Sequence, residues 1–209
     1  MKDNAVDLAI VNIGQLLTMA EKGLGIIENA AIVIHNGIII DVGETSIRQH
    51  YHPQQTIDAQ GKVVTPGLID CHTHLIFSGS RENEMVQRLQ GESYLTILKR
   101  GGGILSTVQR TQKASQESLL SDGKKWLNVA LRYGVTALEI KSGYGLDYEN
   151  ELKQLHVLTE LKERAPQKII PTFLAHGNII LRQAHYIRNR GAVEKIRSSG
   201  QQNRGCFNC

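Results

Sequence analysis

The stretch that decides the fold is Val64-Thr65-Pro66-Gly67-Leu68-Ile69-Asp70-Cys71-His72-Thr73-His74. Its Pro-Gly pair ends a region of short strand patterns, and the apolar run after it predicts a β-strand over residues 68–77. Because side chains two residues apart on a strand point to one face, His72 and His74 are expected to project together. The residues that alternate with them are expected to pack against helices on the opposite face.

Two further strands and two helices follow this stretch in alternation. Apolar runs at residues 135–140 and 169–175 predict the strands. A helix is expected before each strand, and Ser115 and Asp147 are placed to cap the N-termini of these helices. Gly134 is expected to end the first helix. Strands that alternate with helices through short connections are typical of parallel β/α units, so the fold class is α/β.

The residues upstream of this stretch predict a small β unit, residues 1–65. Apolar runs at 31–34 and 38–40 flank Asn36-Gly37, a pair that favours a tight hairpin turn because both residues tolerate positive φ. Downstream, the β/α pattern extends over residues 66–176 and then stops. Residues 177–209 form a basic tail in which we expect irregular structure.

Composition and charge exclude several classes of protein. No stretch of the 209 residues approaches the length of about 18 uncharged apolar residues that a membrane span needs, and the N-terminus does not resemble a signal peptide. Three cysteines provide no disulfide framework, which favours a reducing, cytoplasmic setting. The net charge of +4 comes from residues 177–209, with six basic residues and one acidic, so a nucleic-acid-binding function would depend on that tail alone.

Two interpretations of His72 and His74 stay open at the level of pattern. Two imidazoles that converge from one strand are good ligands for zinc or divalent iron, but buried histidines can also be satisfied by hydrogen bonds within a core. The chain repeats the His-x-His pattern at His50-Tyr51-His52, in a polar stretch before Pro53. We interpret this second pair as part of a solvated loop without function.

Three other residues are candidates for binding a small molecule. Arg81 follows the histidine strand and could bind a carboxylate through a bidentate pair of hydrogen bonds, or it could be a solvated loop arginine. Tyr144 lies among glycines just after the strand at residues 135–140, where loops often carry function. His176 ends the third strand and could face the same end of the sheet, or be structural.

Two sequence features have structural interpretations that we prefer. Gly101-Gly102-Gly103 is interpreted as a flexible turn, since no phosphate-binding pattern follows it. The pair Cys206 and Cys209 lacks a second ligand pair nearby to complete a zinc site.

The stretch at residues 64–74 resembles the first barrel strand of the amidohydrolase superfamily. Further segments, in the same order along the chain, resemble the imidazolonepropionase family over about residues 5–176: residues 77–81, 88–94, 101–104, 139–146 and 151–153. The resemblance implies a partial TIM-like β/α barrel of the metal-dependent hydrolase type, preceded by a small N-terminal β unit that forms part of a composite β-sandwich.

The resemblance also implies a function. Members of this family hydrolyse 4-imidazolone-5-propanoate to N-formimidoyl-L-glutamate in histidine degradation, with one zinc or iron ion. By this resemblance His72 and His74 correspond to metal ligands, and Arg81, Tyr144 and His176 to substrate-binding positions. The family implies a small-molecule substrate, a cytoplasmic enzyme and a possible homodimer, with no nucleic-acid or membrane partner. No serine or cysteine nucleophile is apparent, and no catalytic acid or base is assigned.

The sequence after residue 176 departs from this resemblance. A β/α barrel needs roughly 250 residues, and the later metal ligands of the family have no counterpart here. We therefore expect a product truncated or frameshifted after about residue 176, which the other reading frames of the coding DNA would test. The alternative function is a catalytically inactive fragment of the enzyme, and a nucleic-acid-binding module is a third hypothesis.

Overall fold

The computed structural model describes residues 4–20 and 23–174 of the chain. The chain divides into two compact units at Pro66, and each is described by itself. The segment predicted over residues 177–209, together with His176, lies outside the described residues.

The first unit is a mixed sheet of five strands. Its strand order is β3-β2-β1-β4, with the short β5 also paired to β1. The strands β1 and β2 are antiparallel, whereas β4 and β5 run parallel to β1. The elements are β1 (Ala5–Leu17), β2 (Ile26–His35), β3 (Ile38–Glu44), the 3₁₀ helix η1 (Thr45–His50), β4 (His52–Asp58) and β5 (Val63–Val64).

The hairpin expected at Asn36-Gly37 is present. Both residues have positive φ, 52° and 73°, as a tight turn of this kind requires, and they join β2 to β3. Packing in the unit centres on Ile13, Leu16 and Ile32, which are almost completely buried. A single sheet of this kind could form one half of a composite β-sandwich. The composite sandwich itself stays a prediction.

The interpretation of His50-Tyr51-His52 as a loop is wrong. His50 ends η1, and His52 begins β4, where it pairs with Ala5 of β1. Pro53 misled the prediction: proline is tolerated near the start of a strand at a sheet edge, where its missing N–H leaves no ladder hydrogen bond broken. Both histidines are nevertheless exposed, as expected.

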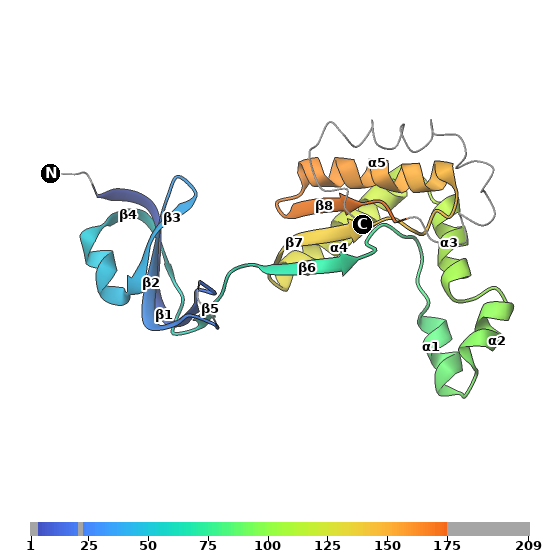
Figure 1. The fold of residues 1–209 in the computed structure, drawn as a ribbon, viewed down its shortest axis with the longest axis horizontal. Coiled ribbons are helices and arrows are strands. Elements are labelled where there is room, and N and C mark those ends of the chain that lie inside the picture. Colours follow the sequence, from blue (N-terminus) through green and yellow to red (C-terminus); the bar gives the residue numbers. More distant parts are fainter. Residues whose placement is uncertain (1–3, 21–22, 175–209) are drawn as a thin grey trace. The chain divides into compact units, whose positions relative to one another are not determined.

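The second unit contains a parallel three-stranded sheet in the order β6-β7-β8. The strands alternate with helices, as the sequence predicted (Figure 1). The elements are β6 (Leu68–Thr73), α1 (Glu82–Leu89), α2 (Tyr94–Lys99), α3 (Ile104–Lys113), α4 (Gln116–Arg132), β7 (Val135–Lys141), α5 (Tyr148–Arg164) and β8 (Lys168–Thr172).

The two long helices begin at the predicted caps. The hydroxyl of Ser115 accepts a hydrogen bond from the backbone N–H of Ser118, and the carboxylate of Asp147 accepts one from Asn150. Helix α4 ends at Arg132, and Gly134 adopts a φ of 81° just beyond it. These local signals identified α4 and α5 correctly.

The apolar core of the second unit lies on one face of its sheet. Leu138 and Ile140 of β7 and Ile169 of β8 are buried there against α4 and α5. The helical side of this core consists of Leu119, Leu127, Val157, Leu158 and Leu161. The opposite face of the sheet carries no helix among the described residues.

Strand β6 lies at the edge of this sheet, and its side chains are largely exposed. Ile69 is 73% exposed, and Cys71 is exposed rather than packed against helices as expected. The expectation fails because α4 and α5 cover β7 and β8 but do not extend over the edge strand. No described helix is both long enough and apolar enough to cross a membrane.

Candidate functional site

His72 and His74 lie together at the end of β6. Their ring centroids are 5.7 Å apart, with 57° between the ring planes. Between them, Thr73 pairs in register with the buried Ile140, and its hydroxyl donates a hydrogen bond of 2.8 Å to the carbonyl of Glu139. Residues that pair in a parallel ladder point to the same side, so Thr73 faces the helix-covered side and the two imidazoles face the open side.

Tyr144 joins this pair from the loop after β7. Its ring centroid lies 5.4 Å from that of His74 and 6.2 Å from that of Phe77. The structure thus brings together three of the sequence-predicted residues, His72, His74 and Tyr144, from two neighbouring strands. We refer to these three residues as the ring group.

The loop that contains Tyr144 is held by hydrogen bonds to helix α5. The buried carboxylate of Glu151 accepts hydrogen bonds from the backbone N–H groups of Gly145, at 2.8 Å, and Leu146, at 2.9 Å. A Cβ atom at position 145 would lie 2.4 Å from the backbone nitrogen of Glu151, so only glycine fits there. Gly143, with a φ of 125°, makes the turn before Tyr144.

A polar cluster that the sequence analysis did not single out lies on the same open face. The carboxylate of Glu139 accepts hydrogen bonds from the ammonium of Lys141 and, at 2.8 Å, from the hydroxyl of Thr172 on β8. Lys141 above all, then Thr172, holds the pKa of Glu139 below its usual value, and the charge on His72 acts in the same direction. The signal was available, since Glu139 and Lys141 are charged residues two apart within an apolar strand.

Two side chains of the ring group, His72 and His74, could hold a metal ion in part. Two imidazoles side by side on an open strand end are a suitable donor pair for a divalent ion. Within residues 4–20 and 23–174, however, no three His, Cys, Asp or Glu side chains lie close enough together to hold a metal ion. Any further ligand must therefore come from outside the described residues.

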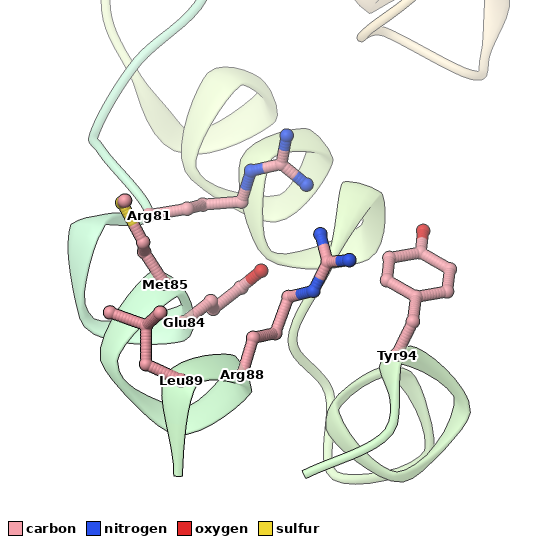
Figure 2. A pocket seen from close by; sticks show the side chains of 6 residues that line it. All are labelled: Arg81, Glu84, Met85, Arg88, Leu89 and Tyr94. Carbon is pink, nitrogen blue, oxygen red and sulfur yellow. The ribbon is translucent and has the colours of Figure 1, made fainter. Parts of the chain in front are cut away.

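Arg81 lies apart from the ring group. It stands at the N-cap position of α1 and lines an open hollow of about 550 Å³ between α1 and α2 (Figure 2). None of the three rings lines this hollow, and no described contact joins Arg81 to them. The predicted substrate-binding role of Arg81 therefore stays a prediction, and His176 lies outside the described residues.

The glycine run at residues 101–103 forms the turn between α2 and α3, in line with the structural interpretation. Gly101 and Gly103 both have positive φ, and the backbone N–H of Gly103 donates a hydrogen bond of 2.8 Å to the carboxylate of Glu84. This bond ties the turn to α1. Cys206 and Cys209 lie outside the described residues.

Comparison with known sequences found similarity to amidohydrolases. A family model described as "Amidohydrolase family" matches residues 55–129. The imidazolonepropionase of Bacillus cytotoxicus is 48% identical over 183 residues, which cover 82% of this chain and 43% of that protein. The imidazolonepropionase of Bacillus cereus is 47% identical over the same length. The chain therefore spans less than half the length of the curated relatives it matches.

Solved structures show the same fold at low sequence identity. A mutant of atrazine chlorohydrolase from Arthrobacter aurescens, complexed with zinc and atraton, matches with a TM-score of 0.56 and 20% identity, over 79% of this chain and 35% of that one. An adenosine deaminase from Xanthomonas campestris with bound zinc matches with a TM-score of 0.53 and 18% identity, over 81% and 43%. The expected fold class, α/β with part of a β/α barrel, is confirmed.

Proposed function

Since the chain is related to the imidazolonepropionases of the amidohydrolase superfamily, we propose that it has their activity, the hydrolysis of 4-imidazolone-5-propanoate to N-formimidoyl-L-glutamate in histidine degradation. The reaction adds one water molecule across a ring C–N bond, so the proposed enzyme is a hydrolase acting on a cyclic amide. The observation that carries the proposal is the ring group of His72, His74 and Tyr144 on the open face of the sheet.

The donor set of His72 and His74 supports the binding of one divalent ion, zinc or iron. A ring-centroid distance of 5.7 Å lets both side chains reach a common ligand position, and the open face leaves room for further donors. When bound, such an ion supplies Lewis acidity, which activates water and polarises a carbonyl. Histidine donors suit both metals, so the choice between zinc and iron stays with experiment.

Tyr144 and Arg81 are proposed to bind and orient the substrate. The phenol of Tyr144, next to His74, can donate a hydrogen bond to the ring carbonyl. The guanidinium of Arg81 can bind the propanoate carboxylate through paired hydrogen bonds. His176 is proposed as a third substrate-binding residue. Together these roles require a substrate that reaches from the rings to Arg81.

The proposed partners follow from the same activity. The substrate is a small molecule, and a second copy of the chain is a candidate subunit. The exposed free thiol of Cys71 is compatible with the reducing cytoplasm that we propose as the site of action.

The alternative is that the chain is a catalytically inactive fragment of this enzyme, and a specific observation supports it. Among the described residues, no three His, Cys, Asp or Glu side chains lie close enough together to hold a metal ion, and Ile69 and Leu68 of β6 are 73% and 53% exposed at a sheet edge. A site with two imidazoles alone is under-coordinated, and an apolar edge strand is prone to association.

One experiment separates the two functions. The purified chain is supplied with zinc or iron, and the consumption of 4-imidazolone-5-propanoate is measured for the wild type, His72→Ala and His50→Ala. Turnover that His72→Ala abolishes and His50→Ala retains is the expected result for the hydrolase. A folded wild-type chain that binds metal without turnover would instead establish the inactive fragment.

A further inference from the structure

We propose that Arg88 is a second guanidinium in the hollow between α1 and α2, where Arg81 is proposed to bind the propanoate carboxylate, and that Arg88 determines the selectivity of this hollow for a short-chain monocarboxylate. The hollow is lined by Arg81, Glu84, Met85, Arg88, Leu89 and Tyr94 (Figure 2). This inference deepens the proposed function, on which it rests, because a propanoate group is the charged part of the proposed substrate.

One face of α1 builds most of this hollow. Arg81, Glu84 and Arg88 recur at intervals of three and four residues, and Met85 and Leu89 lie one position further along the same face. In Figure 2 both guanidinium groups and the carboxylate of Glu84 point into the space between the two helices, with the Tyr94 ring on the opposite wall. The helix thus aims two positive charges at one site.

Neither guanidinium is neutralised by the described residues. Neither Arg81 nor Arg88 makes a side-chain hydrogen bond or ion pair there. By contrast, Arg100 pairs with Glu92 at 2.9 Å, and Arg110 donates to the carbonyl of Ser80 at 2.6 Å. Two unpaired guanidinium groups in one hollow are a ready binding place for an anion.

Glu84 is the side chain that would be expected to neutralise Arg88, yet it does not. It lies four residues before Arg88, the favourable spacing for an ion pair on a helix, but the two are not within ion-pair distance. Its carboxylate accepts a hydrogen bond from the backbone N–H of Gly103 instead. Glu84 therefore contributes negative charge to the hollow while Arg88 keeps its hydrogen-bond donors for a ligand.

Charge and polarity together select the ligand class. Two guanidinium groups and one carboxylate leave the hollow with one net positive charge, which a monoanion balances, whereas a doubly charged phosphate would leave one negative charge unbalanced. Met85 and Leu89, 66% and 78% exposed, offer an apolar wall to a short methylene chain. The phenol of Tyr94 adds a hydrogen-bond donor. These properties fit a carboxylate on a short apolar stem.

The test is a titration of the full chain with propanoate, propanamide and inorganic phosphate, followed by NMR. Propanoate is expected to bind and propanamide not to bind at the same concentrations. Arg88→Gln is expected to weaken propanoate binding about tenfold, as the loss of one charge-assisted contact predicts. Arg88→Lys keeps the positive charge but lacks the planar guanidinium, so its affinity for propanoate is expected to lie between those of the wild type and Arg88→Gln.

Matched variants make the result decisive. Arg132, exposed in the last turn of α4 as Arg88 is in that of α1, provides the control, and Arg132→Gln is expected to leave binding unchanged. Glu84→Gln is expected to raise phosphate binding relative to propanoate. Equal binding of propanoate by the wild type and Arg88→Gln, or equal binding of propanoate and propanamide, would overturn the inference. Propanoate binding needs no ring opening, so loss of turnover with this binding intact would count against the proposed hydrolase alone.

Discussion

The chain contains the pattern His-x-His twice, and among the described residues only one copy lies in contact with other rings. His72 lies at the end of β6 and His74 just after it, with their ring centroids 5.7 Å apart and Tyr144 beside them. His50 and His52 flank the boundary between η1 and β4, are both exposed, and make no ring contact with each other among the described residues. The same spacing therefore brings the two rings together only where the neighbouring strands and helices support it.

The difference lies in what supports each pair. Behind His72 and His74, the neighbouring strand β7 buries Leu138 and Ile140 against two helices, and its following loop brings Tyr144 forward. Behind His50 and His52, Tyr51 donates a hydrogen bond to Asp41, a half-buried contact in the first unit. A buried layer fixes the first pair, whereas the second pair lies on a solvated surface.

The largest expected effect comes from removing part of that buried layer. Ile140 is fully buried on the helix-covered face of β7, so Ile140→Ala is expected to destabilise the second unit by about 2–5 kcal/mol. Urea unfolding followed through the single tryptophan, Trp126 of α4, measures this change. The matched control is Ile57→Ala in β4, where the side chain is 51% exposed and the expected cost is below about 1 kcal/mol. Because Trp126 lies in the second unit, the unfolding of this variant is followed through the backbone amide NMR signals of β4. Equal effects of the two variants would remove the structural distinction between the histidine pairs.

The next effect concerns the contact between Tyr144 and His74. Gly145→Ala places a Cβ atom against the backbone nitrogen of Glu151, so the loop must shift, at a cost of about 1–3 kcal/mol. We expect the nuclear Overhauser contacts between the rings of Tyr144 and His74 to be lost, while the signals of His50 and His52 stay in place. Retained ring contacts at unchanged stability would show that Gly145 does not position Tyr144.

The smallest effect is a change in acidity on the open face. Lys141→Met removes the main cause of the low pKa of Glu139, so this pKa is expected to rise toward its ordinary value of 4.5. Because folding lowers this pKa, the stability it contributes is present above pH 4.5 and is lost as the pH falls through the folded-state value. Carboxyl NMR titration measures the shift.

Asp58 in the first unit is an internal control for this titration. Its pKa is held below the ordinary value by the backbone N–H of Gln60 and by Asn12, neither of which the variant changes. A Glu139 pKa that stays low in Lys141→Met would mean that Thr172 and His72 account for it without Lys141.

Local signals in the sequence predicted much of this fold. Capping residues such as Ser115 and Asp147 and the turn at Asn36-Gly37 act through their immediate neighbours, so they can be read from a few residues. The strand β4 was missed because its pairing with β1 depends on residues about fifty positions away, and Pro53 suggested a break. Cys71 was misplaced because the sequence does not indicate how far the helices extend over the sheet.

The candidate site divides in the same way. The alternation of His72 and His74 was readable from a single strand, whereas the approach of Tyr144 to His74 depends on the pairing of β6 with β7. The cluster of Glu139, Lys141 and Thr172 was missed because charged residues in an apolar strand were not assigned a face. The hollow at Arg88 could not be predicted from the sequence, because it depends on how α1 and α2 pack against each other.

The most direct test of the account is a zinc titration of the full chain, followed through the NMR signals of individual histidine side chains. We predict that His72 and His74 respond together, at lower zinc concentration than His50 and His52, and that His74→Ala abolishes the response of His72. A response of both pairs at the same concentration, or of His50 and His52 first, would contradict the claim that the support behind β6 turns a common pattern into a metal site.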